Sequence, residues 1–174
     1  MVDSLRLVLP TFELQNQYLE MLADWQSTGE KLIPFVLKFD PSDFEALIKQ
    51  LEDYRLGVNL PQGYVPGSTF WLINADLQIL GIINIRHFLN DSLLEHGGNI
   101  GYGIRPSERR KGYATKMLKL ALAEAKKIGL KRVLITCDKD NIGSQRTIIR
   151  NGGQLESEIL YDGIPVQRYW IELS

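Results

Sequence analysis

Residues 99–137 restrict the fold more than any other part of the chain. Isoleucine and tyrosine alternate with small residues over 99–104, which is typical of a strand, and Pro106 ends it because proline has no N–H to donate. Over 114–128, apolar side chains share one helical face and lysines the other, and Gly129 ends the helix. Residues 132–137 are almost continuously apolar, as expected of a strand buried on both faces. This strand–helix–strand order predicts a crossover within a sheet that is flanked by helices.

The rest of the chain adds strands and helices on both sides of this crossover. Helix start signals and apolar periodicity predict further helices that begin near Thr11, near Ser42 and at Asp140 or Asn141. Strand-like runs predict a first strand, a central hairpin and a C-terminal hairpin at 5–9, 69–88 and 155–173. Two polar stretches with glycine, 57–68 and 90–98, are expected to be loops. Since no repeat or linker interrupts the pattern, we expect an α/β fold with one mixed sheet, in a single domain over residues 1–174.

The composition excludes several classes of protein. The formal net charge is −1, so no global field attracts nucleic acid or an anionic membrane, and neither is expected as a partner. Cys137 is the single cysteine, which rules out an intramolecular disulfide and favours a reducing compartment. The sequence has neither an apolar run long enough to span a bilayer nor the layout of a signal peptide. We therefore expect a soluble cytoplasmic protein.

A basic turn with a glycine, residues 107–115, opens the helix of the crossover. Unpaired backbone N–H groups, the positive end of the helix dipole and three cationic side chains meet there, and this combination suits a pyrophosphate. Its spacing, Arg109-x-x-Gly112-x-Ala114, resembles the acyl-CoA pyrophosphate loop of the GNAT superfamily of N-acetyltransferases. After the next strand, Asn141-Ile-Gly-Ser144 resembles the Asn-x-x-[Ala/Ser] start of the following helix in that family. The order of the predicted elements also resembles the GNAT fold over nearly the whole chain.

The resemblance implies a fold and a cofactor. The GNAT fold has a mixed, mostly antiparallel central sheet of about seven strands flanked by four helices. Its middle strands, here 99–104 and 133–137, splay apart to admit the pantetheine arm of acetyl-CoA. A backbone N–H near Gly103 or Ile104 would bind the thioester oxygen, and a Cβ at Gly112 would press against the phosphates. The residues implied in cofactor binding are Ile104, Arg109, Arg110, Lys111, Gly112, Tyr113, Ala114, Thr115, Asn141 and Ser144.

The alternative interpretation of the basic turn is an ordinary helix start, without a ligand, whose arginine and lysine side chains are solvated. The glycines Gly101 and Gly103 mark either a close backbone approach in the strand or a simple relief of packing. An unrelated nucleotide-binding module is disfavoured, because the turn lacks a Lys-[Ser/Thr] pair directly after its glycine. No metal site is predicted.

The residues for proton transfer depart from the family pattern. Many relatives carry a tyrosine acid at the position of Ile148 here, and some carry a glutamate base at the position of Gly98. The nearest titratable groups are Glu95 and His96, and a histidine with an ordinary pKa near 6.5 can take a proton from an ammonium through a water. We name Glu95 and His96 as candidate catalytic residues. The alternative, that they belong to a solvated loop without a role, stays open.

The function implied is that of an N-acetyltransferase. The acetyl group of acetyl-CoA would pass to a primary amine of a small molecule or peptide by direct attack in a ternary complex. The alternative is a domain that binds or senses acyl-CoA without reacting. The acceptor site is expected between 29–40, 57–68 and 160–167, with Trp25, Phe35, Tyr64 and Tyr161 as aromatic candidates for its walls. No acidic cluster or basic groove selects the acceptor, and a homodimer is left open.

Overall fold

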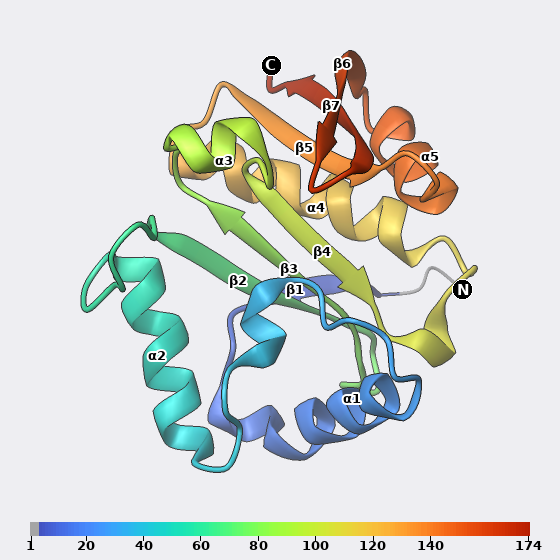
Figure 1. Cartoon of the computed structure of the whole chain (residues 1–174). Coiled ribbons are helices and arrows are strands. Elements are labelled where there is room, and N and C mark those ends of the chain that lie inside the picture. Colours follow the sequence, from blue (N-terminus) through green and yellow to red (C-terminus); the bar gives the residue numbers. More distant parts are fainter. Residues whose placement is uncertain (1–3) are drawn as a thin grey trace.

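The computed structural model describes residues 4–174 and has the predicted α/β fold (Figure 1). One sheet has the order β1-β2-β3-β4, with every neighbouring pair antiparallel. Its strands are β1 (Arg6–Val8), β2 (Gly67–Ile73), β3 (Ile79–Arg86) and β4 (Ile100–Ile104). A second antiparallel sheet has the order β5-β7-β6, with β5 (Arg132–Asp138), β6 (Gln154–Tyr161) and β7 (Ile164–Glu172). The expected single layer is therefore divided into two hydrogen-bonded sheets, and the division lies between the two central strands.

The two sheets touch where β4 begins. The N–H of Asn99 donates to the carbonyl of Leu134 at 2.7 Å, and the N–H of Leu134 donates to the Asn99 side-chain oxygen at 2.8 Å. Gly97 adds a backbone N–H bond to the Thr136 hydroxyl at 3.2 Å. Beyond this junction β4 and β5 diverge toward the right of Figure 1. The predicted splaying of the middle strands is present.

Helices cover both faces of the first sheet. On one face, α1 (Gln15–Ser27), η2 (Phe35–Lys38) and α2 (Phe44–Leu56) pack on β2 and β3 through a core that includes Trp25, Leu47 and Trp71. On the other face, α4 (Tyr113–Ile128) packs through Met117, Leu118 and Ala121 into a second core shared with β5 and β7. The remaining elements are η1 (Phe12–Leu14), α3 (Asp91–Glu95), η3 (Pro106–Glu108) and α5 (Ile142–Arg150).

Two helix starts differ from the sequence predictions. Helix α2 is capped by Asp43, whose carboxylate accepts the N–H of Ala46 at 3.0 Å, while Ser42 instead bonds Asp40. The stretch 90–98, expected to be a loop, contains α3, because the Asn90 side chain accepts the N–H of Leu93 and caps this short helix. A helix of five residues is too short to give the sequence an apolar period, so nothing but its cap signals it.

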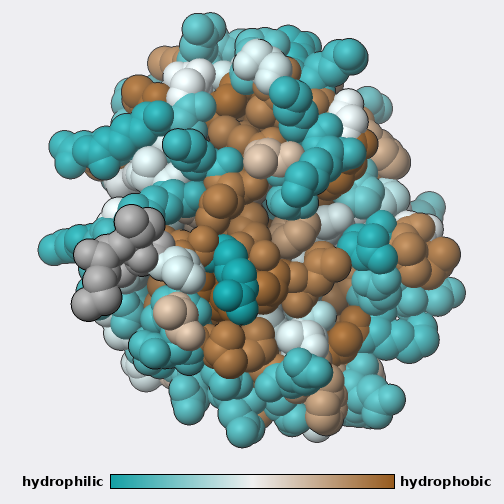
Figure 2. Space-filling model, turned by 180° about the vertical axis from the view of Figure 1, so that it is seen from behind, coloured by the Kyte–Doolittle hydropathy of each residue, from teal (hydrophilic) through white to brown (hydrophobic). Residues whose placement is uncertain are grey.

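Seen from behind, hydrophobic residues gather across the middle of the molecule with hydrophilic residues around them (Figure 2). In the part of the chain that the structure describes, no helix has the length and apolar character required to cross a bilayer.

Candidate active site

A cavity of about 590 Å³ opens where β4 gives way to α4. We call it the large cavity. Its walls come from the β4–α4 turn, the end of α1, the segment after α1 and the first turns of α5. It is lined by nine of the ten residues predicted to bind the cofactor: Ile104, Arg109, Arg110, Gly112, Tyr113, Ala114, Thr115, Asn141 and Ser144.

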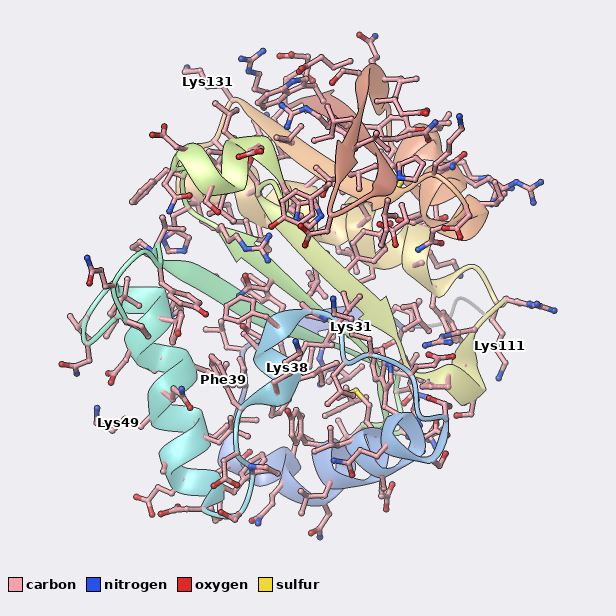
Figure 3. The ribbon with its side chains drawn as sticks, in the orientation of Figure 1. Lys31, Lys38, Phe39, Lys49, Lys111 and Lys131 are labelled. Carbon is pink, nitrogen blue, oxygen red and sulfur yellow. The ribbon has the colours of Figure 1, made fainter. Side chains whose placement is uncertain are left out.

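Lys111 is the predicted cofactor residue that does not line the large cavity. Its ammonium donates to Glu108 at 2.8 Å, and it lies at the outer edge of the molecule (Figure 3). Lys31, from the segment after α1, does line the cavity and lies near the middle of the same view. The positive charge at this site therefore comes partly from a residue that local sequence reasoning did not select.

The backbone of the turn presents donors to the large cavity. Gly112 adopts a left-handed conformation with φ of 81°, which favours glycine, and it begins α4 without any side-chain cap. The first N–H bond into the helix runs from Lys116 to Gly112 at 3.3 Å. The N–H groups of Tyr113, Ala114 and Thr115 precede that bond, so they are the donors that a helix start leaves for a ligand.

Arg109 is used to hold the turn in place. Its guanidinium makes two bonds to the Glu30 carboxylate, at 2.8 and 2.7 Å, and lies 5.8 Å from the centre of the Trp25 ring. Its Nε donates to the carbonyl of Ile104 at 3.1 Å. The hydrogen bonds from Arg109 lower the pKa of Glu30, which therefore stays ionised at neutral pH. Arg109 thus ties the turn to the end of α1 instead of standing free for a phosphate.

Three other arginines supply charge to the large cavity. Arg110 comes from the turn, and Arg146 and Arg150 come from one face of α5, four residues apart. Among the described residues, none of the three has a carboxylate within ion-pair distance. The sequence analysis missed the two on α5, although their spacing of four on a helix next to the Asn141 motif is a usable signal.

Asp24 on α1 holds the start of the turn through hydrogen bonds. Its carboxylate accepts the Nε–H of Arg105 at 3.0 Å, the N–H of Ser107 at 3.2 Å and the hydroxyl of Ser107 at 2.7 Å. Burial opposes the ionisation of Asp24, but the hydrogen bonds from Ser107 and Arg105 outweigh it and lower its pKa. The N-terminal side of the turn is therefore held by two carboxylates outside the predicted motif, Asp24 and Glu30.

One N–H of β4 is directed into the gap between the sheets. The backbone N–H of Arg86 donates to the Asn99 carbonyl at 2.6 Å and the backbone N–H of Arg105 donates to the Leu80 carbonyl at 2.8 Å, so alternate residues of β4 pair with β3. Gly103 belongs to the paired set, whereas Ile104 belongs to the other set, whose N–H points away from β3. Of the two oxyanion donors considered, this alternation favours Ile104.

The strand glycines mark a close approach by the protein itself. A Cβ on Gly103 would lie 2.5 Å from the Ile33 carbonyl oxygen and 2.8 Å from the Trp25 ring. Gly98 is tighter still, because a Cβ there would lie 2.3 Å from the Leu134 carbonyl oxygen. No side chain fits at position 98, which explains why a glutamate base is absent from it.

A tyrosine hydroxyl lies inside the large cavity. Tyr102 of β4 shares a hydrogen bond of 2.7 Å with the hydroxyl of Ser144 on α5, and both residues line the cavity. Burial raises the pKa of Tyr102 to about 12, so its hydroxyl keeps its proton at neutral pH. Ile148, at the tyrosine position of relatives, is fully buried in the core. Tyr102 was read from the sequence only as an alternating strand residue.

The two candidate bases lie in different settings. His96 ends α3 and stacks on the Tyr161 ring, with 3.8 Å between the ring centres and 8° between the planes. Burial lowers the pKa of His96 below its ordinary value, so the imidazole is neutral at neutral pH. Glu95 is exposed, and its backbone carbonyl accepts a bond from Arg168 at 2.8 Å. Neither lines the large cavity.

A second cavity of about 340 Å³, the small cavity, lies at the far end of β3. Phe35, Tyr54 and Tyr64 form an aromatic wall, with ring centres 5.9–6.0 Å apart. Asn84 and Arg86 of β3 also line it. Two of the expected acceptor segments, 29–40 and 57–68, therefore contribute to it. Of the four aromatic residues expected at the acceptor site, Phe35 and Tyr64 line the small cavity. Trp25 lines the large cavity, and Tyr161 stacks on His96.

Comparison with known proteins decides the family. A family model described as an acetyltransferase (GNAT) domain matches residues 5–154. The chain belongs to the GNAT acetyltransferase family. It is therefore an acyltransferase, and the predicted family, fold and enzyme class are confirmed. A search of curated protein sequences found no match.

Solved GNAT structures share the fold over the whole chain. An acetyltransferase from Salmonella typhimurium that modifies the N-terminal serine of a 50S ribosomal subunit protein is 14% identical, with a TM-score of 0.69 and coverage of 100% of this chain and 97% of that one. The microcin C7 self-immunity acetyltransferase MccE, solved with acetyl-CoA and AMP, is 17% identical, with a TM-score of 0.68 and coverage of 99% and 93%. A spermidine N-acetyltransferase from Vibrio cholerae, solved as a dodecamer, is 14% identical, with a TM-score of 0.65 and coverage of 97% and 94%. Acetyl-CoA, the GNAT cosubstrate, is thus present in one of these similar structures.

Proposed function

We propose that this GNAT domain, residues 1–174, transfers the acetyl group of acetyl-CoA to a primary amine of a small molecule or peptide, by direct attack in a ternary complex. The observation that carries the proposal is the uncapped start of α4 at the wall of the large cavity. The residues of its three backbone N–H groups line the same cavity as Arg110, Arg146 and Arg150. Such a site fits the phosphates of coenzyme A in charge and in donor geometry.

The residues around the gap between the sheets have separate tasks. When bound, acetyl-CoA supplies the acetyl group as a thioester. The N–H of Ile104 donates to the carbonyl oxygen, where negative charge develops. His96, neutral at neutral pH but outside the lining of the large cavity, would accept through a water the proton that the amine loses as its nitrogen bonds the carbonyl carbon. The Tyr102 hydroxyl donates to the sulfur as the carbon–sulfur bond breaks. Asn141 is placed to donate its side-chain N–H to the pantetheine arm, since its side-chain oxygen caps α5.

Similar proteins support this choice of reaction. They act on a protein N-terminal serine in one case and on spermidine in another, so the fold serves both peptide and small-molecule amines. The free, buried thiol of Cys137, whose pKa burial raises to about 11, fits a reducing compartment such as the cytoplasm. The dodecamer of the spermidine enzyme makes self-association of this chain worth measuring.

The test combines binding and turnover. Acetyl-CoA should raise the melting temperature of the protein, and thiol release from acetyl-CoA should be seen with members of a broad amine panel. Gly112→Glu should abolish both effects, because it adds a side chain and a negative charge at the phosphate site. Gly129→Glu is the matched control, since Gly129 also has a positive φ, 103°, and open space around it, but lies at the other end of α4.

The alternative function, acyl-CoA binding without reaction, rests on Ile148 and on the closed position at Gly98. Stabilisation by acetyl-CoA without thiol release from any amine would favour it and would contradict the proposed transfer. Stabilisation that survives unchanged in Gly112→Glu would contradict the proposed cofactor site.

A further inference from the structure

Arg86 is a largely buried arginine at the end of β3, and within residues 4–174 its charge has no carboxylate partner. Its Nη1 donates to the carbonyls of Gly97 and Gly98, both at 3.0 Å. Its guanidinium carbon lies 5.6 Å from the centre of the Phe35 ring. Among the described residues, no carboxylate lies within 4.0 Å of it. Burial lowers the pKa of Arg86 to about 10, and the side chain is still cationic at neutral pH.

The Arg86 guanidinium has N–H groups that no acceptor in the described part of the chain uses. It carries five N–H groups, and the two carbonyls account for those of Nη1. Nε and Nη2 have no acceptor in the described part of the chain. Nη2 reaches over β4, where it lies 3.3 Å from the place that a Cβ on Gly101 would take. A largely buried cation with unused donors is costly unless an anion joins it.

Asn84 gives a second, independent sign of a ligand at the same place. It lies two residues before Arg86, hence on the same face of β3, and both line the small cavity. Asn84 is fully buried, its Nδ2 donates to the Thr69 hydroxyl at 3.0 Å, and its Oδ1 has no partner. Buried polar groups are almost always hydrogen-bonded, so an orphan on a cavity wall points to a polar ligand.

The small and large cavities share no lining residue, but both lie next to the same face of β4. Gly101 lies under Nη2 of Arg86, and Gly103, two residues further along the same strand face, lines the large cavity. Ile33 lines the large cavity and Phe35 the small one, so a single short segment borders both. Ile33, Pro34 and Trp25 pack on the glycines of β4 between the two cavities, so an acceptor seated in the small cavity has to pass this contact to bring its amine to the N–H of Ile104.

We propose that the small cavity binds the acceptor amine and that Arg86 recognises a carboxylate on it. This inference rests on the proposed acetyl transfer. Nε and Nη2 lie on one edge of the guanidinium, the edge that donates to the two oxygens of one carboxylate in a bidentate pair. The aromatic wall packs against the carbon skeleton of the acceptor. Two sources share this chemistry: free amino acids, and short peptides with an acidic side chain near their N-terminal amine.

The experiment compares each carboxylate with its carboxamide, which has the same size but no charge. The panel contains α-amino acids and longer ω-amino acids with their amides, and dipeptides with aspartate or asparagine in second place. With thiol release as the readout, kcat/KM for the reactive carboxylates should exceed that for their amides by at least about tenfold, the effect of about 1.4 kcal/mol. Reaction with the amino acids or with the dipeptides identifies which of the two classes is the acceptor.

Three variants assign the preference to Arg86. Arg86→Gln should remove the preference for the carboxylate over the amide, and Arg86→Lys should retain part of it. Arg6 is an exposed arginine on the edge strand β1, and Arg6→Gln should leave the preference unchanged. Because the ratio of carboxylate to amide is measured on one preparation, a loss of folded protein in a variant cancels.

Two outcomes separate this inference from the proposed function. Amides that react as well as the carboxylates in the unmodified protein, or a preference that survives in Arg86→Gln, would overturn the role of Arg86 and leave acetyl transfer standing. No thiol release from this panel, with release from other amines of the broad panel, would overturn the role of Arg86 alone, and no release from any amine would overturn both.

Discussion

We propose that Tyr102 supplies the acid that Ile148 cannot supply. The tyrosine position of many relatives is occupied by buried Ile148, but Tyr102 reaches the first turn of α5 from β4 and bonds Ser144. We predict that Tyr102→Phe lowers kcat by about 10²-fold, the lower range for loss of a proton donor, and leaves the dissociation constant for acetyl-CoA within about twofold. Steady-state kinetics and calorimetry measure the two quantities. An unchanged kcat would exclude Tyr102 from the chemistry.

His96 should set the acidic limit of activity. Desolvation by burial lowers its pKa below 6.5, and this outweighs Asp138 and Asp162, which raise it; Lys31 and Arg86 lower it further. The imidazole is therefore neutral above this lowered pKa, and kcat/KM should fall only as the pH drops through it, in a window below 6.5. In His96→Gln the acidic limb should disappear and kcat/KM at neutral pH should fall by about 10²-fold. The pH–rate profile measures both, with Glu95→Gln as the matched neighbour expected to keep the limb.

The lowered pKa of His96 also makes the free energy of unfolding depend on pH. Because folded His96 binds protons more weakly than an unfolded histidine, the unfolded state takes up more protons once the pH falls below 6.5. The contribution of His96 to stability is present above 6.5 and declines as the pH falls through that window. His96→Gln should flatten this part of the stability profile, and an unchanged slope would contradict the assignment.

At the scale of elements, the β4–α4 turn depends on α1. Asp24 touches no part of the large cavity, yet it accepts bonds from Arg105 and Ser107 on either side of Pro106. We predict that Asp24→Ala raises the dissociation constant for acetyl-CoA by about tenfold, equivalent to about 1.4 kcal/mol, because binding must then order the turn. Glu20→Ala, an exposed position one turn earlier on α1, should have no effect. Equal affinities for the two variants in calorimetry would show that the turn is fixed without Asp24.

The sequence predicted elements well where a period or a strong terminator marks them. The helix over 114–128 ends at Gly129 as expected, and the strand at 132–137 is buried as expected. Helix α3 was missed because five residues carry no period. Asp43 instead of Ser42 caps α2 because the choice between adjacent capping residues depends on backbone geometry, which composition does not reveal.

At the scale of the whole molecule, the site is assembled from segments that no local pattern connects. The basic turn and the Asn141 motif were found because each is contiguous. Arg86 and Arg146 were missed because their significance depends on what the fold brings beside them. Arg86 meets two loop carbonyls and, among the described residues, no carboxylate, and Arg146 lines the same cavity as the basic turn. Gly98 was identified as a departure from the family, but the reason that no side chain fits there, a Leu134 carbonyl oxygen 2.3 Å from the place that a Cβ would take, exists only in three dimensions.

The junction of the two sheets should control both stability and the shape of the gap. Asn99 is 2% exposed, and its side chain joins β5 to β3 by accepting from the Leu134 N–H and donating to the Arg86 carbonyl at 3.3 Å. Asn99→Ala leaves both backbone groups without that partner, so we predict a loss of about 2–4 kcal/mol in the free energy of unfolding, measured by denaturant titration. Asn16→Ala, an exposed asparagine on α1, should stay within about 0.5 kcal/mol of the unmodified protein.

The Asn99 variant also separates two ways in which a split sheet can be maintained. If the side chain holds β4 and β5 at the angle that the gap requires, the folded fraction of Asn99→Ala should bind acetyl-CoA more weakly than the unmodified protein. If packing against α4 fixes that angle without help from Asn99, the free energy of unfolding should fall while the affinity of the folded fraction for acetyl-CoA is unchanged. Because the Asn99 N–H bond to Leu134 belongs to the backbone and survives the substitution, the sheets stay in contact and the comparison reports on the side chain. Affinity measured well below the melting temperature distinguishes the two.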